Sequence, residues 1–530
     1  MKLNTHRVVP GGEMTGQYLR MGLFSIAVVW AGLLWQGRMG FQLSDEGSLW
    51  YGTQQVMKGD VPIRDFMSYD IGRYYWSAAL MSLQGDNGIM ALRYAVAVFQ
   101  VLGLYSGLIL VARTSVKPWS FPWFAMATAI LVVWMYPRHK LFDASISIGL
   151  IALLTFLAER PKPSRYFLTG LGVGLAAVFG RNHGVYGAFG SIVEMIFLLS
   201  RSETVVSAPR AVGAWAGGVV VGYSPVLAMV VFCPGFGQAF WEGIRYVFEV
   251  KTTNLTLPIP WPWLITYRQL SVGDSIRSFF VGLFFIGTLI FGLIGLGRTI
   301  WSAWCKEAIS PPVLGCLVLA LPYAHYAYSR ADIGHLALGI FPMLLGLMVW
   351  MSELSSKSFK WSAGGALCAA SLLVMLPMHP GWQSRVGRQW SPILIGRETL
   401  YADQPTERDV AFLKILVTRF APNPTERFLT VPSWPGAYAL MDRPSPTWEI
   451  YPLLPRSELF QRTEILRIEK FPPSFVLIND YAQDGREELR FRNSHSILNS
   501  YLETHYKSAV NVVVPASNYH VLIRSFSGPQ

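Results

Sequence analysis

The chain has 530 residues, of which 52% are hydrophobic and 14% charged, and its mean hydropathy is +0.35. This composition is too apolar for a set of soluble domains and is typical of a membrane protein. The formal net charge is +12, but residues 1–380 hold 27 Lys and Arg against 17 Asp and Glu, whereas residues 381–530 hold 17 against 15. The basic excess therefore belongs to the apolar part, where loop charges set orientation, and we expect no nucleic-acid partner.

Eleven apolar runs follow one another along residues 1–380, each near the ~20 residues that cross a bilayer core. The first run has no small-residue cleavage site behind it, so we expect it to be a retained span rather than a signal peptide. The expected spans are about residues 21–38, 87–111, 119–136 and 144–158, two runs on either side of 180–184, residues 212–232, a run ending near 298, residues 311–328, a run after 329–335, and residues 361–376.

Lysines and arginines in alternate loops give these spans an orientation. The basic groups after spans two, four, six, eight and ten fall on the same side as the basic N-terminus, which the positive-inside rule places in the cytoplasm. We therefore expect a multi-pass protein of the inner (plasma) membrane whose tail and polar loops face outward, where function is concentrated. The orienting residues are Arg113, Lys117, Arg160, Lys162, Arg165, Arg201, Arg210, Arg298, Lys306, Lys357 and Lys360.

The loop over residues 41–76 is richer in acids than any other. Asp45 and Glu46 stand side by side directly after the first span, and Asp60, Asp65 and Asp70 follow. A charge held near lipid costs roughly 2.5–3.5 kcal/mol on insertion scales, so an acidic pair at the rim of a span indicates a functional site. The alternative is a solvated cap on the next helix, because acids also favour helix N-termini.

Residues 381–530 have mixed charge, a helix-like segment (ERDVAFLKILVTRF) and four β-rich runs (RFLTVP, SFVLIND, NVVVP and YHVLIRS) separated by Pro, Asn and Gly. These patterns favour a small α/β domain. The predicted fold is a polytopic α-helical membrane protein with about eleven transmembrane helices over residues 1–380 and a C-terminal extracytoplasmic α/β domain over residues 381–530. The tail segment SWPGAYALMDRPSPTWE can be an ordinary loop or a rim over the membrane cavity.

Several motifs occur in the order seen in a known family. The acidic pair with Gly47, followed by GDVPIRDF, YDIGRYYW and LRYA, resembles the start of the GT-C membrane glycosyltransferases, which use polyprenyl-phosphate sugars and are related to protein O-mannosyltransferases and the lipid A aminoarabinose transferase. RNHGVYG and SRADIGHL are similar to loops of bacterial members. The resemblance covers roughly residues 20–350 and not the tail in any detail.

The resemblance implies catalytic roles for the acidic pair. In this family an aspartate of the first outer loop activates the acceptor hydroxyl or amine, and here that residue would be Asp45. Glu46 would orient Asp45 or the acceptor. Such chemistry needs a base because a hydroxyl is a weak nucleophile, and positioned proton transfer typically contributes ~10²- to 10⁴-fold.

A lipid-phosphate leaving group requires cations, because guanidinium and ammonium groups neutralise phosphate charge as the glycosyl bond breaks. Each outward-facing cation can instead anchor to lipid head groups or to a carboxylate such as Asp332, and His139 and His183 can be ordinary interfacial histidines. The candidates for donor-phosphate or substrate binding are Arg330, His335, Arg181, Arg138, Lys140, Arg245 and Tyr74.

Asp143, at the start of the fourth span, is a second acidic candidate. Family members often carry an acid in the second outer loop, so Asp143 would hold a metal or the acceptor, although an N-cap explains the FDAS sequence equally well. A divalent cation with Asp45 and Asp143 as ligands is conceivable, but hard cations want several oxygens, and metal dependence is left open.

The sequence thus predicts a glycosyltransferase that moves a sugar from a polyprenyl-phosphate donor to a lipid, polysaccharide or protein acceptor on the outer face of the membrane. One alternative is a transporter or flippase of a lipid-linked saccharide, although polar residues here gather at one face rather than at mid-bilayer, with Glu194 as the main exception. A surface-polysaccharide polymerase or ligase and a non-catalytic assembly protein are also consistent with these patterns. The sugar, the acceptor and the oligomeric state are not encoded in any motif.

Overall fold

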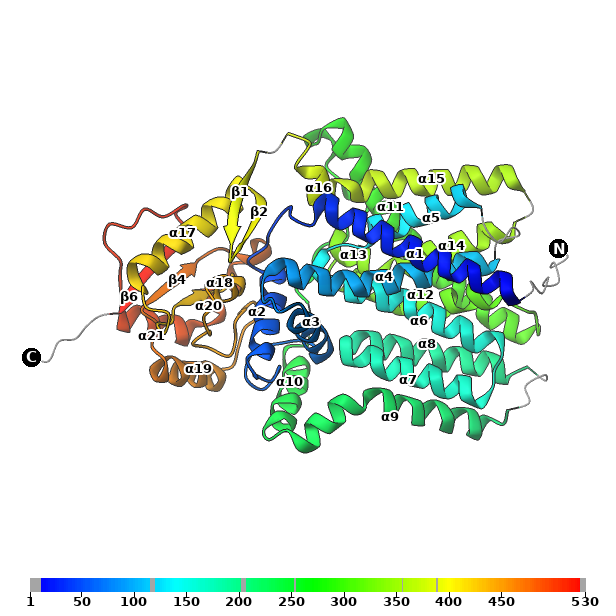
Figure 1. The fold of residues 1–530 in the computed structure, drawn as a ribbon, viewed down its shortest axis with the longest axis horizontal. Helices are drawn as coiled ribbons and strands as arrows, with labels where there is room; N and C mark the ends of the chain where they lie inside the picture. Colours follow the sequence, from blue (N-terminus) through cyan, green and yellow to red (C-terminus); the bar gives the residue numbers. More distant parts are fainter. Residues whose placement is uncertain are drawn as a thin grey trace, which may run out of the picture. The chain divides into compact units, whose positions relative to one another are not determined.

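The computed structural model describes residues 11–114, 120–201, 206–251, 254–354, 356–387 and 389–524 (Figure 1). The chain divides into two compact units. Unit 1 holds Met1–Gln36, Val96–Pro225 and Asn254–Trp382, and unit 2 holds Gly37–Ala95, Val226–Thr253 and Gln383–Gln530. The N-terminal segment 1–10, with Lys2 and Arg7, and Lys117 lie outside the described residues; these basic residues were part of the predicted orientation.

Unit 1 is helical. Its core lies around α12, which packs against α6, α8, α11, α13 and α14 and buries most of its own side chains. The helices that lie wholly or partly in this unit are α1 (Gly11–Gln36), α4 (Ile89–Thr114), α5 (Phe121–Trp134), α6 (Leu141–Glu159), α7 (Pro163–Phe179), α8 (Arg181–Leu199), α9 (Ala208–Phe232), α11 (Val272–Trp304), α12 (Pro311–Ser329), α13 (Ile333–Gly339), α14 (Phe341–Glu353) and α15 (Lys357–Met375).

Within the described residues, six helices are long and apolar enough to cross a membrane, and the pair α13 and α14, bent by 51°, makes up to seven. The protein is therefore a multi-pass membrane protein. Each of the eleven predicted spans coincides with a helix or with this bent pair. The count of eleven stays a prediction, because helices such as α5, with 14 residues, fall short of the ~20 residues that span a bilayer core.

Two helices of unit 1 approach each other backbone to backbone. A Cβ added at Gly170 on α7 would lie 1.9 Å from the carbonyl oxygen of Trp215 on α9, and one at Gly222 on α9 would lie 2.1 Å from that of Leu171 on α7. Glycines spaced by four residues on both helices create this contact, which is the small-residue packing typical of membrane helices.

The acidic segment predicted as a loop is mostly helical, which corrects that expectation. It forms α2 (Asp45–Met57) and α3 (Ile71–Gln84), both in unit 2. The buried positions of α3 include Ile71, Tyr74, Ala78 and Met81, which follow the helical period. The segment is too polar for a membrane span, yet it still has one apolar face to bury.

The C-terminal part of unit 2 is a mixed α/β region, as predicted. A four-stranded sheet has the order β3-β4-β6-β5, with β3 and β4 parallel and the other pairs antiparallel. A separate antiparallel pair, β1 and β2, precedes it. The strands are β1 (Trp390–Ile395), β2 (Glu398–Asp403), β3 (Leu429–Val431), β4 (Phe475–Asn479), β5 (Tyr506–Ser508) and β6 (Tyr519–Arg524), and the main helices are α17 (Gln404–Phe420), α18 (Gly436–Leu440), α19 (Glu458–Lys470), α20 (Phe491–Ser494) and α21 (Ser496–His505).

Three of the four predicted β-rich runs and the predicted helix are found as β3, β4, β6 and α17. The strand predicted over the NVVVP run is wrong. Its Val513 is 93% exposed, and β6 pairs instead with Tyr506–Ser508. A β-branched run forms a strand only where a neighbouring strand and an apolar surface accept it.

The tail segment over residues 433–449 contacts the acidic segment, both within unit 2. Gly436 of α18 donates its backbone N–H to the carbonyl oxygen of Leu43 at 2.7 Å. A Cβ added at Gly47 of α2 would lie 2.4 Å from the Cα of Gly436. Further along, the backbone N–H of Ser445 donates to the Tyr51 hydroxyl at 2.9 Å, and Trp448 donates its indole N–H to the Ile63 carbonyl oxygen at 3.0 Å.

Because the contact between Gly47 and Gly436 joins two backbones, no side-chain movement can make room for a methyl group there. We expect Gly47→Ala to destabilise the protein by about 1–3 kcal/mol through overpacking. Heat-induced unfolding of the purified protein in detergent measures this. Gly243→Ala, in α10 (Phe236–Val250), is the control, because a Cβ there meets nothing within 4 Å. Equal melting temperatures for the two variants would contradict the predicted contact.

Candidate functional site

Asp45 and Glu46 lie together at the start of α2, but their side chains have different surroundings. Glu46 is buried and pairs with Arg93, which is 2% exposed, through Nε–Oε1 at 2.8 Å and Nη2–Oε2 at 2.7 Å. Arg93 also donates to the carbonyl oxygens of Gly37 and Gly40, at 2.6 and 2.7 Å. The Asp45 side chain is exposed. Glu46 thus fixes the entry to α2, whereas Asp45 is accessible.

The Asp45 carboxylate affects the pKa of three tyrosines of unit 2. Burial and the Asp45 carboxylate raise the pKa of Tyr451, and the same two causes raise the pKa of Tyr69, whose hydroxyl is buried although the residue as a whole is 48% exposed. Burial, together with the carboxylates of Asp484 and Asp45, raises the pKa of Tyr481. All three hydroxyls therefore keep their protons at neutral pH and can donate hydrogen bonds.

Tyr74, a predicted substrate-binding residue, lies under α2. It is 2% exposed, its ring packs edge-on against Phe66 with centroids 5.8 Å apart, and a Cβ added at Gly52 would meet the ring at 2.4 Å. Burial raises the pKa of Tyr74 to about 12. These contacts indicate a packing role that supports the acidic segment.

In unit 1, Asp143 belongs to a buried polar network. His183 Nε2 lies 3.0 Å from Asp143 Oδ1, and His183 Nδ1 lies 2.7 Å from the Tyr323 hydroxyl. The Tyr326 hydroxyl donates to the same Asp143 oxygen at 3.2 Å. Asp143 lies in the first turn of α6, two residues after Leu141, but its side chain forms hydrogen bonds with residues of α8 and α12. The N-cap explanation of FDAS is therefore wrong, because the N-cap of α6 is Lys140.

Arg330 and His335 converge on Asp332, as their spacing in one turn suggests. Arg330 Nε donates to Asp332 Oδ2 at 2.7 Å, while the backbone N–H of His335 and its Nδ1 lie 2.8 and 2.9 Å from Asp332 Oδ1. Asp332 thereby caps α13. Burial alone would raise the pKa of Asp332, but the hydrogen bonds from His335 and Arg330 lower it to about 2. Arg330 also donates to the Leu255 carbonyl oxygen at 2.9 Å.

The remaining predicted cations differ in the hydrogen bonds and ion pairs that their side chains form. Arg138 donates to the Gln36 carbonyl oxygen at 2.9 Å, and Arg245 pairs with Glu249 at 3.0 Å in an exposed position on α10. Arg181 is the first residue of α8 and is half-buried. Lys140, half-buried in the short helix η1 (Arg138–Lys140), has no side-chain hydrogen bond or ion pair with any described residue. It is the candidate whose charge is most available to a ligand.

The described residues contain no group of three or more His, Cys, Asp or Glu side chains that could hold a metal ion. Asp45 belongs to unit 2 and Asp143 to unit 1, so a cation shared between them rests on the sequence alone. Oδ1 of Asp143 already accepts from His183 and Tyr326, which reduces its capacity to bind a hard cation.

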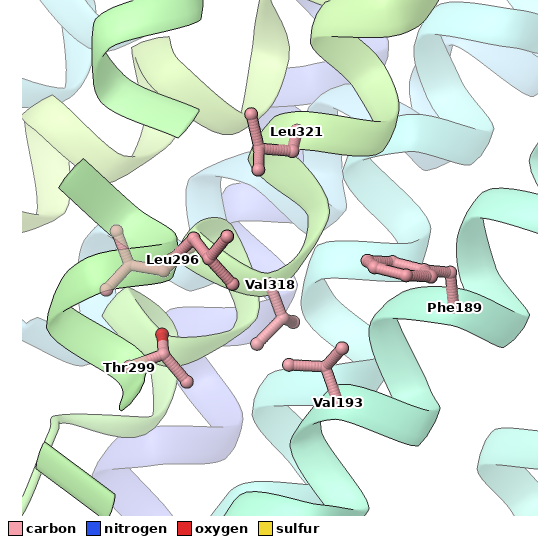
Figure 2. Close-up of a pocket in the computed structure, with 7 residues that line it drawn as sticks. Phe189, Val193, Leu296, Thr299, Val318 and Leu321 are labelled. Atoms are coloured by element: carbon pink, nitrogen blue, oxygen red, sulfur yellow. The ribbon is translucent and has the colours of Figure 1, made fainter. Parts of the chain in front are cut away.

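A small apolar recess of about 10 Å³ lies among α8, α11 and α12 of unit 1 (Figure 2). Thr299 is its one polar lining residue, and the Thr299 hydroxyl is occupied by the Gly295 carbonyl oxygen at 2.8 Å. A space of this size holds at most about one water molecule, so the recess offers no room to a sugar, a phosphate or a lipid chain. Its lining residues are Phe189, Val193, Leu296, Thr299, Leu317, Val318 and Leu321.

Sequence reasoning missed several residues of these sites. Arg93 stands in the LRYA motif, yet its partner Glu46 lies 47 residues away. Tyr451 and Tyr481 are in the tail, where no motif marks them. Tyr323 and Tyr326 lie in an apolar helix, and their spacing of three on one helical face is the signal that could have indicated a shared role.

No protein-family model and no curated protein sequence matches the chain. Solved structures do match. The crystal structure of ArnT from Cupriavidus metallidurans bound to undecaprenyl phosphate aligns with 97% of this chain and 100% of that chain, with a TM-score of 0.50 and 13% identity. The chain therefore shares the fold of this structure over nearly the whole of both chains. This agrees with the resemblance seen in the acidic segment and the later loops.

Two further structures show lower similarity. Apo ArnT from the same organism aligns with 98% of this chain and 100% of that chain, with a TM-score of 0.48 and 13% identity. The archaeal oligosaccharyltransferase AglB from Archaeoglobus fulgidus, in complex with an inhibitory peptide and a dolichol-phosphate, aligns with 97% of this chain and 75% of that chain, with a TM-score of 0.46 and 10% identity.

The ion pair between Glu46 and Arg93 gives a testable stability effect. Glu46→Gln leaves a buried guanidinium without its carboxylate, and we expect a loss of about 3–5 kcal/mol. The matched control is Glu249→Gln, which breaks the exposed pair with Arg245 and should cost less than about 1 kcal/mol. The unfolding midpoint in detergent measures both. Similar small shifts would show that the buried pair does not hold α2.

The lowered pKa of Asp332 predicts an acid dependence. The ordinary value is 3.8 and the folded value about 2, so the carboxylate contributes stability that is fully present above about pH 4 and is lost as the pH falls toward 2. We expect the melting temperature of Asp332→Asn to fall less steeply over this interval than that of wild type. Glu458→Gln, in an exposed pair with Arg462, should follow wild type. Parallel curves for all three proteins would contradict the assignment.

Proposed function

We propose that this protein is a membrane glycosyltransferase that moves a sugar from a polyprenyl-phosphate donor to an acceptor on the outer face of the inner membrane. The observation that carries the proposal is the GT-C fold, which matches the ArnT structure bound to undecaprenyl phosphate over nearly the whole of both chains. The ordered motifs of the acidic segment support the same conclusion. The outward orientation rests on the distribution of lysine and arginine among the loops.

Asp45 is the proposed base. Its carboxylate is exposed at the first residue of α2, and its backbone position is fixed by the adjacent Glu46 and Arg93 pair. Asp45 would accept the proton of the acceptor hydroxyl or amine as that atom attacks the anomeric carbon of the donor sugar. The bond from this carbon to the phosphate oxygen breaks, and the polyprenyl phosphate leaves with the bonding electrons. A single displacement inverts the anomeric configuration.

The leaving phosphate gains negative charge, so cations that meet it stabilise the transition state. Lys140 is the leading candidate because its ammonium has no other partner among the described residues. Arg138, in the same short helix, and Arg181 are proposed to assist it. Arg330 and His335 both bind Asp332, which preorganises them as a pair of groups for a phosphate.

Glu46 is proposed to act as a positioning residue rather than as a second base. Arg93 occupies both of its carboxylate oxygens, and the pair is almost fully buried. With both oxygens engaged by Arg93, Glu46 has no oxygen placed to take a proton from an acceptor. The acidic pair therefore divides into a structural member and a reactive member.

The function is tested by sugar transfer from a panel of radiolabelled polyprenyl-phosphate sugars in membranes that contain wild type or Asp45→Asn at matched expression. Wild type should transfer sugar from at least one donor, and loss of the base should lower transfer by ~10²- to 10⁴-fold. Asp442→Asn, which removes an exposed carboxylate of the same unit paired with Lys58, is the control and should match wild type.

Equal transfer by wild type and Asp45→Asn would remove Asp45 from the mechanism and leave the enzyme class intact. Absence of transfer from every donor, with movement of the lipid carrier across the membrane, would contradict the enzyme class and favour a transporter. The variant Lys140→Gln distinguishes phosphate binding from a structural role of Lys140. It should raise the KM for the donor without changing the melting temperature.

A further inference from the structure

Glu194 on α8 is a buried acid that no step of the proposed reaction uses. The residue is 0% exposed, and neither of its carboxyl oxygens has a hydrogen-bond partner of ordinary geometry among the described residues. α8 coincides with the sixth predicted span and packs against α6, α7 and α12. An ionisable side chain inside the membrane is costly to keep there, so Glu194 indicates a site.

The packing of α8 against α7 shows which residue faces Glu194. The two helices are antiparallel neighbours that meet at Gly180. A Cβ added at Gly187 would lie 3.2 Å from the side chain of Val173, and these two residues are each seven positions from Gly180. Seven further positions, about two helical turns, lead to Glu194 and Tyr166 on the same faces of the two helices. An electrostatic interaction between these two side chains agrees with this register.

The packing of α8 against α6 gives the second neighbour. These two helices run in the same direction, because α7 returns the chain between them. A Cβ added at Gly190 would lie 3.4 Å from the side chain of Leu154, and one turn further along each helix are Glu194 and Ala158. The backbone N–H of Ala158 lies near the carboxyl group. Ala158 is the last residue but one of α6, and Tyr166 is in the first turn of α7, so Glu194 lies close to the place where α6 ends and α7 begins.

The surroundings of Glu194 hold no charge that balances a carboxylate. Glu194 forms no ion pair with any residue that the structure describes, and the nearby Arg165, next to Tyr166 in the chain, pairs with Glu159, as does Arg113. The Tyr166 hydroxyl is also buried and has no hydrogen-bond partner in the described part of the chain. It would give a metal cation a single further oxygen, whereas hard cations take several.

A proton is the ligand that suits this place. A buried charge without a partner is so costly that the group takes up a proton instead. The resulting carboxylic acid has one O–H donor and acceptor oxygens, and a tyrosine hydroxyl both donates and accepts, so the two facing groups have complementary chemistry.

We propose that Glu194 is a proton-binding site inside the membrane, with the Tyr166 hydroxyl as the polar group that faces it. The carboxyl group carries the proton and exchanges it with water at the end where α6 ends and α7 begins, which is the side predicted to face the cytoplasm. Sugar transfer is proposed for the opposite face. The site is therefore separate from the proposed function, and its tests use no sugar donor or acceptor.

Infrared spectroscopy of the full chain in lipid nanodiscs tests the proton directly. The difference spectrum between wild type and Glu194→Gln should contain the carbonyl stretch of a protonated carboxyl group, and this band should shift in D₂O because the proton exchanges. Glu249→Gln is the control, because that exposed acid is ion-paired with Arg245 and its difference spectrum should show carboxylate bands. Carboxylate bands for Glu194, or a carboxyl band that D₂O leaves in place, would overturn the proposal.

The melting temperature of Glu194→Gln gives an independent check. A glutamine has the shape of a protonated glutamate and is also neutral, so the variant should fold and melt at the same temperature as wild type. If Glu194 were instead an unpaired carboxylate, the substitution would remove a buried charge and raise the melting temperature, and that result would contradict the proposal.

Dicyclohexylcarbodiimide distinguishes a proton from a metal cation. This apolar reagent reacts with protonated carboxyl groups: the carboxyl oxygen bonds to the carbodiimide carbon, and the proton moves to one of its nitrogens. Peptide mass spectrometry of the labelled wild type should find the adduct at Glu194 and not at Glu46, which is also buried but is paired with Arg93. Absence of the adduct at Glu194 would count against a bound proton. Protection of Glu194 by sodium ions at constant pH would show that the site takes a metal cation and would overturn the assignment.

Discussion

The buried ion pair between Arg93 and Glu46 is the interaction on which the candidate site depends. Arg93 joins Glu46 to the carbonyl oxygens of Gly37 and Gly40, so a single guanidinium fixes the chain entering α2 and the first turn of that helix. Both charges are out of water, and such a pair is costly unless every hydrogen-bonding position is satisfied. Because Glu46 is held in this way, the neighbouring Asp45 is directed to the surface at a defined place.

The two units contribute different chemistry to the proposed reaction. Unit 2 holds the exposed carboxylate of the proposed base, which suits proton transfer. Unit 1 holds most of the candidate cations together with a buried network of Asp143, His183 and Tyr323, which suits the stabilisation of a leaving phosphate and the rigidity of the helices around it. Most of these cations are balanced by a carboxylate or a carbonyl, and Lys140 differs because no described residue balances its charge.

The sequence predicted the helices of unit 1 well, because an apolar run in a membrane must satisfy its backbone internally and can do so only as a helix. It also predicted that Arg330, Asp332 and His335 lie together, because the three residues fall within one turn. It failed where the outcome depends on distant partners. The acidic segment was expected to be a loop because its polar residues hide the helical period, and the NVVVP run was expected to be a strand although β6 pairs with another segment. Arg93 acts across a gap in sequence that no local pattern reveals.

The central claim is that this chain takes its sugar from a polyprenyl-phosphate donor whose phosphate binds the cations of unit 1. The most direct measurement is a cryo-electron microscopy structure of the full chain in nanodiscs with undecaprenyl phosphate. The account predicts phosphate density within hydrogen-bonding distance of Lys140 or of another candidate cation of unit 1. Phosphate density away from all of these cations, or no bound lipid phosphate at saturating concentration, would contradict the account.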